Sequence, residues 1–146
     1  MNSETNSSQP EALGAPVVLV VEDDPLTRKA VGRNLQVAGY EVILVPSAAD
    51  ALNVAQRVPI HVLVLDLHLV DTDSFNVMND GFAVLDWLRR KFGGLPFRVV
   101  IHTAQTGQHL LEKAEQCGVF AFCHKRRDMT NLLQCVHDAV LSLQVT

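Results

Sequence analysis

The stretch that decides the fold is HVLVLDLHLV, residues 61–70. Four consecutive apolar residues, Val62 to Leu65, are followed directly by the carboxylate of Asp66. A short, continuous apolar run indicates a β-strand covered on both faces, as in a parallel sheet with helices on either side. A carboxylate is costly to bury, so its position at the end of such a strand suggests a chemical role.

The same unit recurs along the chain, where apolar strands alternate with amphipathic helices between Gly and Pro residues. The pattern predicts strands at residues 17–21, 40–45, 60–65, 97–102 and 119–124, and helices at 25–38, 48–57, 81–92, 108–118 and 129–143. Five strand–helix pairs predict an α/β domain in which an open, doubly wound parallel sheet carries helices on both faces. A closed eight-stranded barrel would need ~250 residues.

The first two helices have the clearest start signals. Asp24 is predicted to cap the first helix, whose first turn contains Pro25, and Ser47 is predicted to cap the second. Helical spacing of apolar residues predicts that the buried side of the first helix consists of Leu26, Ala30, Val31, Leu35 and Ala38.

Composition and charge restrict the class of protein. Of the 146 residues, 48% are hydrophobic and 19% are charged, which is typical of a globular domain with a continuous core. No window reaches the ~18 apolar residues of a membrane span. The net charge of -4 argues against nucleic-acid binding, which depends on clustered Lys and Arg. We therefore expect a cytoplasmic protein with neither membrane nor nucleic-acid partners.

The chain is expected to contain one domain, at residues 16–146, with no output domain. Residues 1–15 are polar and rich in Ser, Asn, Pro and Glu, which predicts a disordered leader. The three cysteines form no CxxC pair, so Cys117, Cys123 and Cys135 are predicted to be reduced, packed thiols. The histidines lack ligand spacing, and no zinc site is predicted.

Polar residues follow four of the predicted strands. In open parallel sheets, ligands bind beyond the carboxyl ends of the strands. The residues at those ends are Glu22 and Asp23 after the first strand, Asp66 after the third, Thr103 after the fourth and Lys125 after the fifth. With the first strand central, the three carboxylates would lie close together, and two carboxylates ~4 Å apart repel by about 1 to 4 kcal/mol. A hard divalent cation with oxygen ligands, such as Mg²⁺, would explain the cluster.

Asp66 then becomes a candidate nucleophile beside a bound metal. Lys125 would bring a positive charge to the same place, and the Thr103 hydroxyl could donate a hydrogen bond to an oxyanion there. Metal, ammonium and hydroxyl around one carboxylate describe a site for a phosphoryl group on that carboxylate.

The motifs VLVVEDDP, VLVLDLHL, VVIHTA and FCHK, in this order across residues 17–143, resemble the receiver domain of two-component response regulators, including chemotaxis-regulator-like members. The resemblance implies a flavodoxin-like (βα)5 fold with strand order 2-1-3-4-5. It also implies that Asp66 takes a phosphoryl group from a phosphohistidine on a sensor histidine kinase or histidine phosphotransfer protein. Asp23 would bind Mg²⁺ directly and Glu22 through water, and the backbone carbonyl of His68 would complete the protein ligands.

The resemblance also implies a switch. Thr103 and Phe122 match the switch pair, Lys125 would bind a phosphoryl oxygen, and the His68 side chain and Gln105 would tune hydrolysis of the phosphoaspartate. The signal would reach a downstream protein through the face formed by the fourth helix, the fifth strand and the fifth helix. A monomer or weak homodimer is expected, which assists its own phosphorylation and dephosphorylation without being a turnover enzyme.

The chain departs from the family pattern in two places. Arg126 stands where the family usually has a proline in a cis peptide, so we expect a trans peptide after Lys125 and a reshaped loop. Gly81 follows Asp66 by fifteen residues, seven more than the resemblance implies. The longer segment is either a tolerated surface insertion, a cover over the phosphorylation site, or part of a partner contact.

Three alternatives remain beside the phosphorylated receiver. A phosphatase of the haloacid dehalogenase type would need a second aspartate at position 68, which is His68. A flavodoxin-like ligand-binding module would need a phosphate cradle after the first strand, where EDDP would repel a phosphate in the absence of metal. A degenerate receiver that signals by protein contacts without phosphorylation is the most serious alternative.

Overall fold

A five-stranded sheet forms the centre of the molecule. The computed structural model describes residues 14–67 and 81–144; His68 and the long segment before Gly81 lie outside these ranges. The strands are β2 (Val17–Val21), β3 (Glu41–Val45), β4 (Val62–Leu65), β5 (Arg98–Thr103) and β6 (Ala121–His124). They pair in the order β3-β2-β4-β5-β6, and all four pairings are parallel. The predicted strand order 2-1-3-4-5 is confirmed.

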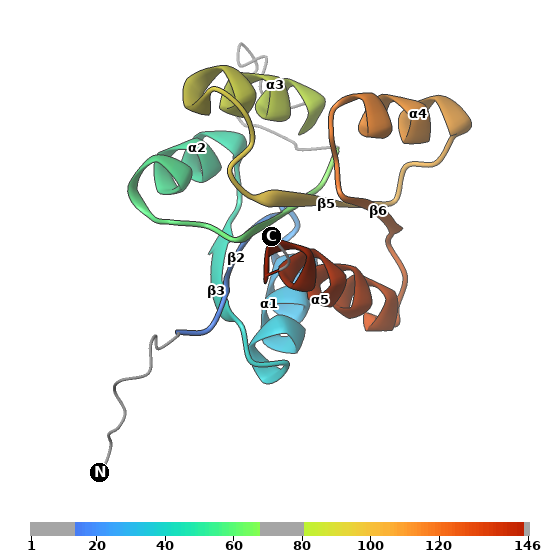
Figure 1. Ribbon diagram of the computed structural model, residues 1–146. Coiled ribbons are helices and arrows are strands. Elements are labelled where there is room, and N and C mark those ends of the chain that lie inside the picture. The colour runs from blue at the N-terminus through green and yellow to red at the C-terminus, as the bar shows by residue number, and fades with distance from the viewer. Residues whose placement is uncertain (1–13, 68–80, 145–146) are drawn as a thin grey trace.

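Helices cover both faces of the sheet (Figure 1). They are α1 (Pro25–Val37), α2 (Ala48–Arg57), α3 (Gly81–Phe92), α4 (Gln108–Gln116) and α5 (Thr130–Gln144). Residues of α2, α3 and α4 join one hydrophobic core, and residues of α1 and α5 join the other. This three-layer arrangement confirms the doubly wound architecture, and the element ends differ from the predicted ones by up to two residues.

Alternating side chains of each central strand enter the two cores. In β4, Leu63 and Leu65 pack with α2, α3 and α4, whereas Val62 and Val64 pack with α1 and α5. Because successive side chains point to opposite faces, a strand buried on both faces must be apolar throughout. This requirement explains the uninterrupted VLVL run.

Both predicted caps are present. Asp24 Oδ2 accepts a hydrogen bond from the Thr27 backbone N–H at 2.9 Å, and Ser47 Oγ accepts one from the Asp50 backbone N–H at 3.2 Å. The Asp24 cap starts α1 directly after the first strand, and it leaves Glu22 and Asp23 at the strand end.

The predicted buried side of α1 was wrong at three positions. Leu26 is 79% exposed, and Ala30 and Ala38 are exposed too, whereas Val31, Gly32 and Leu35 are buried. A Cβ on Gly32 would lie 2.6 Å from Leu44 Cδ1. The helix therefore lies close to β3 along its glycine, which turns the N-terminal leucine outward.

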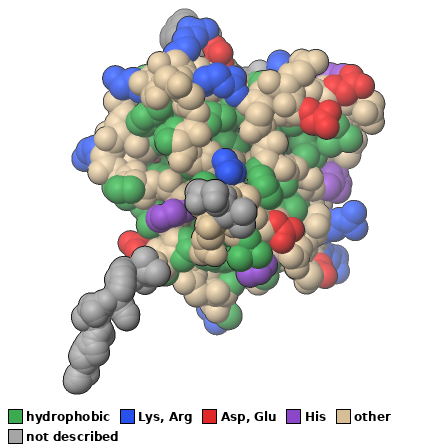
Figure 2. All heavy atoms as spheres, viewed as in Figure 1, with side chains coloured by type: hydrophobic (Ala, Val, Ile, Leu, Met, Phe, Trp, Pro, Cys, Tyr) green, Lys and Arg blue, Asp and Glu red, His purple; other side chains and the backbone are tan. Residues whose placement is uncertain are grey.

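No helix among residues 14–67 and 81–144 has the length and apolarity that a membrane span requires. On the face shown in Figure 2, Lys and Arg gather over α3 and Asp and Glu gather over α4. The basic side chains at the end of α3 are Arg89, Arg90 and Lys91.

Candidate functional site

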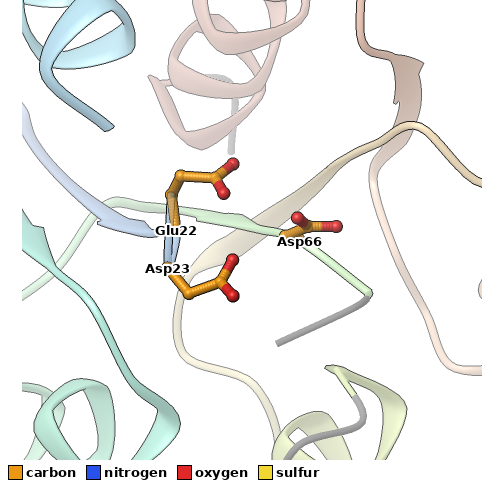
Figure 3. Close-up of side chains that lie close together, drawn as sticks. All are labelled: Glu22, Asp23 and Asp66. Atoms are coloured by element: carbon orange, nitrogen blue, oxygen red, sulfur yellow. The ribbon is translucent and has the colours of Figure 1, made fainter. Parts of the chain in front are cut away.

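Three carboxylates meet at the carboxyl edge of the sheet. Glu22 and Asp23 follow β2, Asp66 follows β4, and these adjacent parallel strands end in register. One carboxylate oxygen of each residue lies within 4.8 Å of the others. Figure 3 shows the three side chains extending from the two strand ends toward the same space. The predicted cluster is therefore present, and its hard oxygen donors are of the kind that suits Mg²⁺.

The backbone around these carboxylates is held on several sides. The backbone N–H groups of Glu22 and Asp66 donate to the carbonyls of Val45 and Val21, which extends the sheet pairing by one residue. Glu22 is 3% exposed and Asp66 5% exposed. The cluster is thus fixed on the sheet and not carried by a loose loop.

Arg28 supports the first strand end from α1. Its Nη1 donates to the backbone carbonyl of Glu22 at 3.0 Å and to that of Asp23 at 3.4 Å. The Asp24 backbone N–H also donates to Glu22 Oε2 at 3.1 Å. Sequence reasoning missed the role of Arg28; a cation one turn into the helix after an acidic run was the available signal.

Lys125 bridges two of the three carboxylates. Its Nζ lies 2.7 Å from Glu22 Oε1 and 2.8 Å from Asp66 Oδ2. Its backbone N–H donates to the Thr103 carbonyl at 2.8 Å, which places it directly beyond β6. The described residues contain no cis peptide, so the bond to Arg126 is trans as predicted. The missing proline does not prevent the ammonium group from reaching the site.

Burial and charge pairing act in opposite directions on these groups. Burial raises the pKa of Glu22, although hydrogen bonds from Lys125 and from the Asp24 backbone oppose that rise. Burial alone would lower the pKa of Lys125, but its hydrogen bonds to Asp66 and Glu22 outweigh burial, and its pKa is raised. The ammonium group is therefore charged at neutral pH and holds the buried carboxylates together.

Thr103 completes the polar edge. It ends β5 and is fully buried, and its Oγ1 accepts a hydrogen bond from the Gln105 backbone N–H at 3.2 Å. Thr103 and Lys125 line a cavity of about 340 Å³ together with Glu22, Asp23, Asp24, Asp66, Ala104 and Gln105. The residues predicted from four strand ends thus surround one space.

Gly81 packs against the backbone of the candidate phosphoacceptor. A Cβ at this position would lie 2.8 Å from the Asp66 carbonyl oxygen and 3.0 Å from Leu67 Cα. Its own N–H donates to the Leu67 carbonyl at 3.0 Å. Glycine is therefore required where α3 begins, despite the seven extra residues that precede it.

Two other residues, Phe122 and His68, were also predicted to take part in the site. Phe122 lies in β6, half-buried against the core that contains α4, and it lines a second cavity with Leu111 and Phe120. The structure places it within that core, and its predicted movement stays a prediction. The predicted contribution of His68 falls outside the described residues.

Sequence comparison decides the family. The pattern of the response regulator receiver domain matches residues 18–137. The chain belongs to this family. Receiver domains are signalling modules of two-component systems and not turnover enzymes, and histidine kinases are their general partners. The acidic pocket of Glu22, Asp23 and Asp66 is consistent with a phosphoacceptor aspartate site.

Two curated relatives show how much of a longer protein the match covers. The chain is 30% identical over 123 residues to the transcriptional regulatory protein GlrR of Escherichia coli, covering 84% of this chain and 26% of GlrR. It is 33% identical over 124 residues to the transcriptional regulatory protein KdpE of Mycobacterium tuberculosis, covering 85% of this chain and 50% of KdpE. The chain thus spans half or less of these relatives.

Solved structures show the same fold. The signal receiver domain of a LuxO repressor protein from Vibrio parahaemolyticus has a TM-score of 0.78 at 25% identity, covering 90% of this chain and 94% of that one. The response regulator TrrA of Thermotoga maritima, solved in complex with Mg²⁺-BeF, has a TM-score of 0.70 at 20% identity. That match covers 85% of this chain and 98% of TrrA, and at this identity it shows the fold alone.

Proposed function

We propose that Asp66 is the phosphoacceptor and that it receives its phosphoryl group from a phosphohistidine on a sensor histidine kinase or a phosphotransfer protein. The observation that carries the proposal is the Lys125 ammonium group, which bridges Asp66 and Glu22 inside a cluster of three carboxylates. A nucleophilic carboxylate, a fixed cation and a buried threonine at one cavity are the groups that transfer to a carboxylate needs.

The same cluster would hold Mg²⁺ through oxygen ligands. Asp23 and Asp66 would bind it directly, Glu22 would act through water, and the His68 carbonyl would be a further ligand. Mg²⁺ supplies positive charge that offsets the negative charge of the phosphoryl oxygens. The fit rests on three oxygen donors within 4.8 Å of one another.

The transfer itself uses groups of the chain. A bond forms between a carboxylate oxygen of Asp66 and phosphorus as the phosphorus–nitrogen bond of the phosphohistidine breaks, and the imidazole leaves with the electron pair of that bond. Lys125 then pairs with a phosphoryl oxygen. Thr103 Oγ1 accepts a hydrogen bond from Gln105, so its own proton is available to donate to another phosphoryl oxygen.

The aspartyl phosphate would carry a charge of about -1.5 to -2, against the single negative charge of the carboxylate that it replaces, and this charge would act on neighbouring residues at the same edge of the sheet. Thr103 is paired in register with His124 of β6, and Phe122 lies two residues earlier in that strand. A shift of Thr103 toward the phosphoryl group would therefore bear on the face of α4, β6 and α5. Exposed Leu111 and Phe120 beside Phe122 supply apolar surface there for a downstream protein.

Labelling with acetyl phosphate tests this proposal. Wild-type protein incubated with acetyl phosphate and Mg²⁺ should form an acid-stable, base-labile acyl phosphate, and Asp66→Asn should reduce that labelling by at least about 100-fold. Asp86→Asn, which removes an exposed carboxylate on α3, is the matched control and should label normally. Equal labelling of wild type and Asp66→Asn would refute the assignment. Absence of labelling in both would support the degenerate receiver instead.

A further inference from the structure

Arg28 reaches back from the first turn of α1 to the strand end that carries Glu22 and Asp23. Its Nη1 donates to the Glu22 carbonyl at 3.0 Å and to the Asp23 carbonyl at 3.4 Å. Side chains of a helix lean toward its N-terminus, so the fourth residue of α1 is placed to contact the residues just before the helix. The guanidinium group therefore binds the main chain of two residues that are proposed to hold Mg²⁺.

The two carbonyls belong to the peptide groups on either side of the Asp23 Cα. A peptide group is planar, so the backbone at one residue has only two soft torsions, φ and ψ. Hydrogen bonds that hold both flanking peptide groups therefore restrain φ and ψ of Asp23 together. These two torsions set the direction in which the Cβ leaves the backbone, and Arg28 thereby restrains where the Asp23 carboxylate points.

Of the three carboxylates, that of Asp23 is the least supported by burial. Glu22 and Asp66 are 3% and 5% exposed, whereas Asp23 is only half-buried. Asp23 lies in the short connection between β2 and α1, one residue beyond the Glu22 N–H that donates to the Val45 carbonyl. None of residues 23–30 is buried. Core packing therefore contributes little to the position of this connection, and its hydrogen bonds matter more.

We propose that Arg28 is a positioning residue for Mg²⁺, which holds the Asp23 carboxylate in the direction that binds the ion. The proposal rests on the proposed function only in the assignment of Asp23 as a direct Mg²⁺ ligand. Groups that orient metal ligands without touching the metal typically change metal affinity by about 10- to 100-fold when they are removed. Arg28 acts through the backbone of the ligand, so we expect an effect at the lower end of that range.

The positive charge of Arg28 acts in the opposite sense to its hydrogen bonds. A fixed cation near the cluster repels Mg²⁺, so loss of the charge alone would tighten Mg²⁺ binding. Loss of the two hydrogen bonds would free the Asp23 backbone and weaken Mg²⁺ binding. The direction in which the affinity changes therefore separates positioning from charge.

Titration of unphosphorylated protein with MgCl₂ at pH 7, followed by nuclear magnetic resonance, tests the proposal. The backbone amide signal of Asp66 is the reporter, because Asp66 follows a different strand from the carbonyl partners of Arg28. Arg28→Met should raise the Mg²⁺ dissociation constant by about tenfold. Arg28→Lys keeps a charged N–H donor, and its dissociation constant should lie within about threefold of the wild-type value.

Both variants should fold. Methionine and lysine keep an unbranched apolar stem at this half-buried position, and the backbone N–H of residue 28 keeps its hydrogen bond to the Asp24 carbonyl. Urea denaturation in EDTA measures the stability that each variant loses without metal. A loss of stability with an unchanged Mg²⁺ dissociation constant would show a merely structural role and overturn the proposal.

Lys29→Met is the matched control. It removes one positive charge from the adjacent, exposed position of α1, and its Mg²⁺ dissociation constant should stay within about twofold of wild type because solvent screens that charge. Tighter binding by Arg28→Met, or equal weakening by Lys29→Met, would overturn the proposal. If wild-type protein binds no Mg²⁺, the proposed metal site fails as well; if wild type binds and Arg28→Met binds equally, only the role of Arg28 fails.

Discussion

The interior of the sheet and the strand-end residue Asp66 are both buried, but the interior is apolar and Asp66 is a carboxylate. Leu63 and Leu65 of β4 are 1% and 0% exposed, and Asp66, the next residue, is only 5% exposed. Burial of the leucines stabilises the fold by about 25 cal/mol per Å² of apolar surface. Burial of the edge carboxylates costs stability, which the chain offsets in part through Lys125. The apolar interior therefore stabilises the fold, whereas the buried carboxylates lower its stability and serve the proposed phosphorylation.

Leu63→Ala should have the largest effect on stability and little effect on chemistry. Leu63 is fully buried in the core of α2, α3 and α4, so its truncation should lower the free energy of unfolding by about 2–5 kcal/mol. Urea denaturation measures this loss. Acetyl phosphate labelling per folded molecule should stay near the wild-type level; a tenfold drop would show that interior and edge are not separable.

Gly81→Ala should affect both regions. The added Cβ would lie 2.8 Å from the Asp66 carbonyl oxygen, so the backbone at the edge must shift, at a cost of about 1–3 kcal/mol. Labelling of Asp66 should slow at the same time. Gly14→Ala is the control, since a Cβ there meets no atom within 4 Å. If the Gly81→Ala variant is labelled at the wild-type rate, Asp66 tolerates this displacement of the backbone at the carboxyl edge.

Lys125→Met should destabilise the protein in the absence of divalent cations. It leaves Glu22 and Asp66 without their shared ammonium group, and because Lys125 is itself partly exposed we expect a loss of about 1–2 kcal/mol. Adding Mg²⁺ should restore much of this loss. Thermal unfolding with EDTA and with Mg²⁺ measures both effects, and an Mg²⁺-independent loss would argue against a cation in the cluster.

Glu22→Gln should slightly stabilise the protein at pH 7, by less than about 1 kcal/mol. The pKa of Glu22 in the folded protein is raised above its ordinary value of 4.5. Wild-type protein therefore loses stability as the pH rises from 4.5 through the folded-state pKa of Glu22. The glutamine variant lacks this loss, and the two proteins should converge below pH 4.5, where Glu22 is protonated in both folded and unfolded states. Urea denaturation at several pH values measures the difference; a glutamine variant less stable at pH 7 would contradict the sign.

Much of this edge could be predicted from the sequence, because the carboxyl ends of parallel strands share one edge. Apolar runs that end in Glu22, Asp66 and Thr103 therefore placed these groups at that edge, and the strand order that the family resemblance implies brought them together. The caps by Asp24 and Ser47 were also predictable, since each depends only on residues within one turn.

Features that depend on contacts between distant elements were not predictable. The outward position of Leu26 follows from the approach of Gly32 to Leu44, which brings α1 against β3. The bridge from Lys125 to Glu22 and Asp66 depends on where a long side chain points, which periodicity does not determine. The support by Arg28 depends on backbone carbonyls at the strand end, which carry no side-chain signal.

The location of the phosphoryl group tests the central claim most directly. Protein treated with acetyl phosphate and Mg²⁺ can be reduced with borohydride, which converts an aspartyl phosphate to homoserine, and then digested for peptide mass spectrometry. We predict reduction at position 66 and not at Asp23, although the two carboxylates lie in one cluster. Reduction at Asp23, or no reduced aspartate in protein that has consumed acetyl phosphate, would contradict the account.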